Sequence, residues 1–223
     1  MTFLDGAYAR LHRAGEHLAD LELREKALAH SEIEKIVAKT DLNTVKDFVL
    51  YDPAAELPQS LSILIGEIIY NLRAVLDYLI FDLALLDTGT AQSGTQFPID
   101  DTPDNFAGHR ARFLKGLSVE HIARIEALQP YNGNYFTAMI RDISNPDKHR
   151  KLTLIGSNGV YGVKTIRTSE QQTDHKTGAV TVYRMEMKSE FIGHIVFKDD
   201  EKPAVDTLKI LQAEVGKILG DFK

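Results

Sequence analysis

The sequence contains no cysteine and no tryptophan, and only 7 of its 223 residues are proline. Without cysteine the chain cannot form a disulfide scaffold, use a cysteine nucleophile or bind a metal through thiolates. A basic surplus is also missing, because 26 lysines and arginines stand against 32 acidic residues and give a net charge of −6. Proteins that wrap nucleic acid are normally basic overall, so any contact with nucleic acid must be local.

Targeting and membrane signals are missing as well. Residues 1–6 lack a basic start followed by an apolar run, so we expect no signal peptide. The most apolar stretch, Leu61 to Leu86, is long enough to cross a bilayer, but it contains Glu67, Arg73, Asp77 and Asp82. Each of these would cost about 2.5–3.5 kcal/mol at the bilayer centre. We therefore predict a buried helix in a cytoplasmic protein that makes no membrane contact.

Helical patterns fill the first two thirds of the chain. Leucines at 4, 11 and 18 repeat every seven residues and predict a long first helix, whose apolar stripe packs within the chain or, as the less favoured alternative, forms a dimer seam. A second helix is predicted from Ser60 to Leu86, with its apolar residues on one half and its charges on the other. Shorter helices are predicted after Thr102 and Ser118, which are capping residues, and from about Tyr135.

Strand patterns follow the helices. One strand is predicted near residues 43–51, and after Asn145-Pro146 the apolar period changes from 3.6 to 2. The segments 152–155, 160–168, 180–187 and 192–197 are predicted strands, with a hairpin turn at 174–178. The sequence thus predicts one α+β domain over residues 1–223. It has a helical bundle core to about residue 150, a small antiparallel β-sheet meander over about 151–198, and a C-terminal helix over about 203–222.

The sequence has no strong catalytic or cofactor motif. Its eight histidines form no recognised metal-ligand spacing. There is no phosphate-binding Gly-x-x-x-x-Gly-Lys-Ser/Thr loop, no Gly-x-Gly-x-x-Gly after a strand and no Gly-x-Ser-x-Gly nucleophile elbow. We therefore predict neither a metal nor a cofactor.

Two polar blocks carry the candidate chemistry. The first, Tyr70 to Tyr78, places Arg73 and Asp77 one helical turn apart, where they can pair. The second, Asn145 to Arg150, puts four ionisable residues in a row, including an imidazole that titrates near neutral pH. One interpretation is structural, with the second block bracing the helix of the first. In the other, both blocks line a cleft where Arg73 binds a phosphate and His149 or Tyr78 transfers a proton. The substrate-binding candidates are Asn71, Asp77, Asn145, Asp147, Lys148 and Arg150.

The same blocks resemble motifs shared by a broad group of uncharacterised bacterial and phage proteins. The shared segments are Ile65-Gly66-Glu67 through Leu79, Gln96 to Ile99, Leu128 to Tyr131 and Asn145 to Arg150. This resemblance implies a family but no activity.

A weaker resemblance links Arg73 and Tyr78 to HEPN domains. These helical bundles, many of them metal-independent ribonucleases, carry an Arg-x-x-x-x-His signature in a cleft between two protomers. The resemblance implies a homodimer that acts on RNA, in phage defence or a toxin system, and only Arg73 carries over from the signature as a catalytic residue. His149 of the second block and Tyr78 are the further catalytic candidates, for proton transfer. Tyr78 stands at the histidine position, which departs from that signature. The alternative is a non-catalytic module that interacts with protein or nucleic acid.

Overall fold

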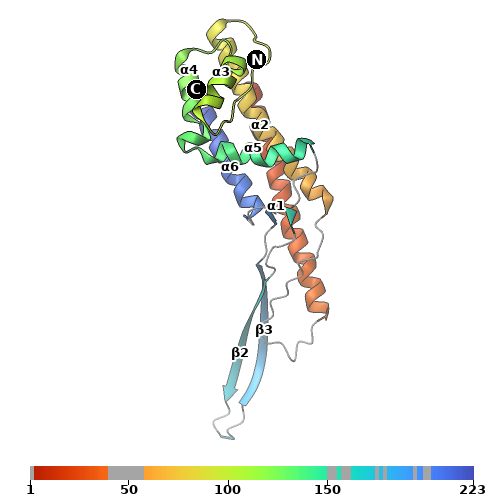
Figure 1. The fold of residues 1–223 in the computed structure, drawn as a ribbon. Helices are drawn as coiled ribbons and strands as arrows, with labels where there is room; N and C mark the ends of the chain where they lie inside the picture. The colour runs from red at the N-terminus through yellow and green to blue at the C-terminus, as the bar shows by residue number, and fades with distance from the viewer. Residues whose placement is uncertain are drawn as a thin grey trace. The chain divides into compact units, whose positions relative to one another are not determined.

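The computed structural model describes most of the chain and is mainly helical (Figure 1). The described residues are 3–39, 58–149, 155–156, 162–173, 176–177, 180–192, 195–197 and 202–223. Contacts divide the chain into two compact units. Unit 1 comprises residues 1–22, 58–155 and 204–223, and unit 2 comprises residues 23–57 and 156–203.

The core of unit 1 is built around the helix α2 (Gln59–Thr88), which packs against α5 (Tyr135–His149) and α6 (Ala204–Asp221). The apolar half predicted for this helix is buried from Leu61 to Leu83, but Leu86 is 59% exposed, so its predicted burial is wrong. The helix ends at Gly89, whose left-handed φ of 71° suits a residue without a side chain.

The first helix, α1 (Asp5–Lys39), belongs to unit 1 as far as Glu22. Its stripe of Ala7, Ala14, Leu18 and Leu21 is buried. This part of α1 lies beside α6, because a Cβ added to Gly216 would be 3.5 Å from Leu11 Cδ2. The stripe is therefore used inside the chain, which is the interpretation that the sequence favours.

Two short helices follow α2 and begin at the predicted caps. The side chain of Thr102 accepts a hydrogen bond at the start of α3 (Pro103–Phe113), and Ser118 does the same for α4 (Val119–Ala127). A short 3-10 turn, Pro130–Asn132, leads into α5. The last helix of the chain, α6, also lies where it is predicted.

Unit 2 contains the longest strands of the described chain. The strands β2 (Gly162–Thr173) and β3 (Val180–Ile192) pair antiparallel from Gly162↔Ile192 to Thr173↔Val180, with a register shift at Glu170/Gln171. Two short strands, β1 (Ile155–Gly156) and β4 (Val196–Phe197), form a separate pair.

The predicted α+β class with a sheet meander is wrong, because the described residues are mostly helical. Alternating β-branched residues favour extended backbone locally, but they do not specify how many strands pair. Here β2 and β3 pair with each other and with no further described strand, so no meander forms. The contacts assign residues 23–57 and 156–203 to a unit of their own, and the single domain over residues 1–223 stays a prediction.

The strand predicted near residues 43–51 lies outside the described residues. Within the described residues, no helix is both long and apolar enough to span a bilayer. The charged side chains within α2 account for this result.

Candidate functional site

Arg73 and Asp77 together hold the backbone of Phe97, and we call this arrangement the Phe97 clamp. Arg73 Nη2 donates a hydrogen bond to the Phe97 carbonyl oxygen at 2.5 Å, and the Phe97 N–H donates to Asp77 Oδ1 at 2.9 Å. The two side chains also pair with each other, with Arg73 Nη2 3.3 Å from Asp77 Oδ1. Both polar groups of one peptide residue are thus satisfied by one turn of α2.

The clamp leaves Arg73 almost inaccessible to solvent. The residue is only 8% exposed, and Phe97, whose carbonyl oxygen it binds, is fully buried. Burial lowers the pKa of the Arg73 guanidinium from its ordinary value, and the charge of Asp77 partly offsets this effect. The sequence motifs around Arg73 and Gln96-Phe97-Pro98-Ile99 therefore meet in space as a structural contact.

Asn71 is also buried, and both polar atoms of its side chain form hydrogen bonds. Its Nδ2 donates to the Glu67 carbonyl oxygen at 2.8 Å, and its Oδ1 accepts from Arg10 Nη1 at 3.2 Å. The Arg10 guanidinium in turn lies 5.7 Å from the Tyr78 ring centroid and 6.0 Å from that of Tyr70. Asn71 therefore joins α2 to α1, since it binds a side chain of that helix.

Tyr78 is separated from Arg73 by its place on the helix. Five residues turn an α-helix by about 140° beyond a full turn, so the two side chains leave α2 in different directions. Tyr78 is 38% exposed, whereas Arg73 is buried. The structure does not bring these two predicted catalytic residues together.

Most of the second block, Asn145 to His149, belongs to the helix α5. The helix runs to His149 and includes the backbone of Asn145, Asp147 and Lys148. The side chains of 145–149, and the whole of Arg150, lie outside the described residues. The predicted meeting of Arg73 with His149 therefore stays a prediction.

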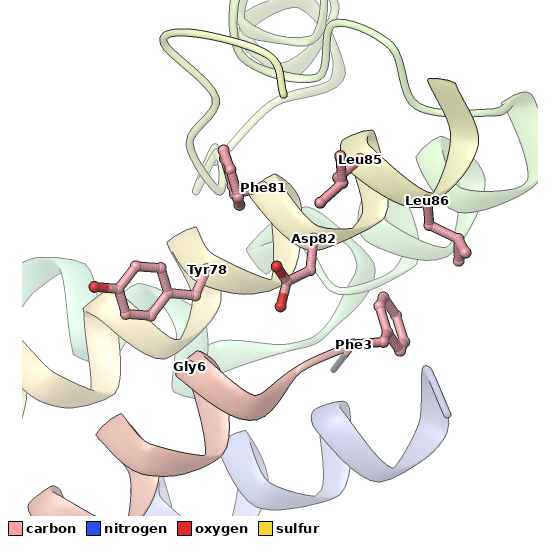
Figure 2. A pocket seen from close by; sticks show the side chains of 7 residues that line it. All are labelled: Phe3, Gly6, Tyr78, Phe81, Asp82, Leu85 and Leu86. Carbon is pink, nitrogen blue, oxygen red and sulfur yellow. The ribbon is translucent and has the colours of Figure 1, made fainter. Parts of the chain in front are cut away.

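An apolar hollow on unit 1 was not predicted from the sequence, and we call it the Asp82 pocket. It has a volume of about 350 Å³ and lies between the start of α1 and the C-terminal half of α2 (Figure 2). Its lining consists of Phe3, Gly6, Tyr78, Phe81, Asp82, Leu85 and Leu86. A signal was present, because Phe81 and Leu85 are apolar residues on the half of α2 that carries the charges.

Asp82 is the one charged residue in this lining. Its Oδ2 accepts a hydrogen bond of 3.0 Å from the Leu4 N–H, at the residue that precedes α1. Leu4 has a φ of 68°, a left-handed conformation that is unfavourable for leucine. Burial raises the pKa of Asp82, the Leu4 hydrogen bond lowers it by less, and the nearby charge of Asp5 raises it further.

A second, more open hollow lies along α1 and α2 and has a volume of about 460 Å³. It is lined by Arg10, Arg13, His17, Ile63, Gly66, Glu67, Tyr70 and Asn71. Its cations already have acidic neighbours, because Arg13 pairs with Glu16 at 2.9 Å and His17 Nδ1 lies 3.9 Å from Glu67. The local charge is thus close to balanced.

Two aspartate–histidine pairs stabilise the connections around α3 and α4. Asp100, 4% exposed, lies 2.7 Å from His109 Nδ1, and its Oδ2 is buried without a hydrogen-bond partner among the described residues. Asp87 accepts from the Ser118 N–H and contacts His121 Nδ1, both at 2.7 Å. Burial raises the pKa of Asp87, but its bonds with His121 and Ser118 lower it more, so the net shift is downward.

The described side chains include no group of three or more histidine, aspartate or glutamate residues that could hold a metal ion. Comparison with known proteins returned nothing: no family model matches the chain, and no curated protein or solved structure matches it either. The two family resemblances therefore stay predictions, and the function must be argued from the geometry.

Proposed function

We propose that unit 1 is a non-catalytic binding module in which the Arg73–Asp77 pair is structural. One observation carries the proposal: the Arg73 guanidinium is buried and bound to the Phe97 carbonyl oxygen and to Asp77. An arginine that binds substrate phosphate must present its guanidinium to the solvent before the substrate arrives. Arg73 could do so only by leaving Asp77 and the Phe97 carbonyl without their partner.

That exchange is energetically unfavourable. Breaking one side of a fully buried ion pair costs about 3–5 kcal/mol, and the cost here lies near the lower end because the Asp77 side chain is 35% exposed. A phosphate would have to recover this loss before it gained any net binding energy. A structural role needs no such exchange, because the pair already satisfies both polar groups of Phe97.

The test incubates purified full-length protein with total RNA, with and without EDTA. We expect no degradation by the wild type, Arg73→Ala or His149→Ala, and a lower melting temperature for Arg73→Ala. Arg13→Ala is the matched control for the melting temperature alone, because it removes an exposed arginine whose side chain pairs with Glu16. RNA cleavage that Arg73→Ala abolishes at an unchanged melting temperature would contradict the proposal.

A HEPN-like ribonuclease is the second candidate, and the hollow lined by Arg10, Arg13 and His17 is the observation that favours it. These residues supply cations for a phosphate and an imidazole for proton transfer, beside the exposed Tyr70. Under this candidate the double variant Arg10→Ala/His17→Ala loses a cleavage activity that the wild type has. If the wild type cleaves no RNA, the ribonuclease candidate is rejected.

The predicted homodimer and cytoplasmic location accompany both candidates as proposals. Light scattering of the purified protein should give twice the chain mass of 24.9 kDa. A mass of one chain would contradict the homodimer. Fractionation of cells that express the chain, with detection in the soluble cytoplasmic fraction, tests the location.

A further inference from the structure

We propose that the Asp82 pocket binds a small hydrophobic cation, namely an amine with an aromatic or alkyl body. The apolar walls would take the body, and the carboxylate of Asp82 would take the ammonium group. This inference rests on the proposed function as a binding module, because it names the ligand class of such a module.

The size and walls of the pocket fit the body of such a ligand. Small-molecule sites commonly have volumes of about 300–1,000 Å³ and mostly apolar linings with a few polar groups. The Asp82 pocket has about 350 Å³, and two phenylalanines, two leucines and the Tyr78 ring supply its walls. Figure 2 shows these side chains around the Asp82 carboxylate, with Phe3 on one side and Tyr78 on the other.

Gly6 leaves part of this space open. A Cβ at position 6 would be 3.9 Å from Tyr78 Cδ2, which is an ordinary contact distance, so packing does not require glycine there. Position 6 therefore adds no side chain to the space between α1 and the Tyr78 ring.

Charge decides what kind of ligand enters. Asp82 has no cation within the lining, and Asp5 adds a second negative charge nearby. The Arg10 guanidinium lies over the Tyr78 ring, 5.7 Å from its centroid, and Arg10 is not part of the lining. Asp82 Oδ2 accepts from Leu4, while Oδ1 accepts no hydrogen bond from the described residues. An ammonium group would donate to Oδ1, and the aromatic walls would add cation–π attraction.

Calorimetric titration of the full-length protein with phenylbutylammonium tests the inference. Two analogues with the same body are the controls, neutral phenylbutanol and anionic phenylbutyrate. We expect the amine to bind roughly tenfold more tightly than the alcohol, as one charge-assisted hydrogen bond implies, and the acid to bind least. Acetyl-lysinamide has the ammonium without the aromatic body, so we expect it to bind much more weakly. Equal affinity for the amine and the alcohol, equal affinity for acetyl-lysinamide, or no saturable binding of the amine would overturn the proposal.

Two variants locate the binding at this pocket. Asp82→Asn keeps an oxygen for the Leu4 N–H, so it should fold while losing the roughly tenfold preference for the amine over the alcohol. Gly6→Leu should abolish binding of both compounds by filling the pocket. Asp104→Asn is the matched control, because Asp104 is an exposed residue of α3 outside the lining, and it should bind like the wild type. Wild-type affinity in a folded Asp82→Asn variant, or in a folded Gly6→Leu variant, would overturn the site. The RNA assay is independent of this titration, so the proposed function and the ligand class can fail separately.

Discussion

Two of the three aspartates of helix α2, Asp77 and Asp82, have closely matched backbone contacts and different electrostatic surroundings. Asp77 accepts the Phe97 N–H at 2.9 Å, and Asp82 accepts the Leu4 N–H at 3.0 Å. Each carboxylate thus attaches a segment distant in sequence to the same helix. Only Asp77 has a guanidinium within 4 Å, that of Arg73, while Asp82 faces an apolar pocket.

The comparison shows that an aspartate bound to a distant backbone N–H can either stabilise the fold or present its charge to a ligand. Where a cation lies beside the carboxylate, as Arg73 does at Asp77, the polar groups bind one another and contribute to the stability of the fold. Where no cation accompanies it, the negative charge remains available to a ligand. The position of the arginine, rather than the backbone contact, separates the structural site from the candidate binding site.

The largest expected effect comes from removing the cation at Asp77. Arg73→Ala removes the guanidinium that Asp77 and the Phe97 carbonyl share, and should lower the free energy of unfolding by about 3 kcal/mol, the lower end of the range for buried pairs, because the Asp77 side chain is 35% exposed. Urea denaturation measures this change. The control Arg13→Ala should stay within about 0.5 kcal/mol of the wild type, as surface ion pairs do. Equal stability of the two variants would contradict a structural role for the Arg73 guanidinium in the Phe97 clamp.

Replacing the carboxylate of the clamp should have an intermediate effect. Asp77→Asn keeps an oxygen for the Phe97 N–H but leaves the buried Arg73 without its counter-charge, and should cost about 1–3 kcal/mol. Urea denaturation with Asp104→Asn as the exposed control measures it. If Asp77→Asn were as stable as the control, the charge of Asp77 would have no structural role.

The substitution Asp82→Asn should raise rather than lower the free energy of unfolding, and its effect should be the smallest of the three. Folding raises the pKa of Asp82 above the usual 3.8, so the folded state binds this proton more tightly than the unfolded chain. The resulting stability is present below the unfolded pKa and is lost as the pH rises through the folded one. Asp82→Asn does not titrate, so its stability relative to the wild type should increase over that pH interval. Thermal melts across this range test it, and a decrease with rising pH would contradict the raised pKa.

Local patterns predicted the helices well, because their signals lie within a few residues. The apolar repeat of α2 and the capping hydroxyls of Thr102 and Ser118 are examples. The sheet meander failed for the opposite reason. The alternation in residues 162–192 favours extended backbone, but the pairing of strands depends on contacts that a local pattern does not contain.

The candidate site was predictable only in part. The spacing of Arg73 and Asp77 indicated their pairing, but their burial depends on Phe97, which lies 20 residues beyond Asp77. The Asp82 pocket was missed because it joins Phe3 and Gly6 to a part of α2 that lies more than 70 residues later. Such a contact follows from the packing of α1 against α2, which no single segment specifies.

The most direct test of the uncompensated charge at Asp82 is a carbon-13 NMR titration of its carboxyl carbon, assigned by comparison with Asp82→Asn. We predict a midpoint above 3.8, the ordinary value for aspartate, and a downward shift when phenylbutylammonium is bound, since a cation stabilises the carboxylate. A midpoint at or below 3.8, unchanged by the amine, would contradict the difference between Asp77 and Asp82.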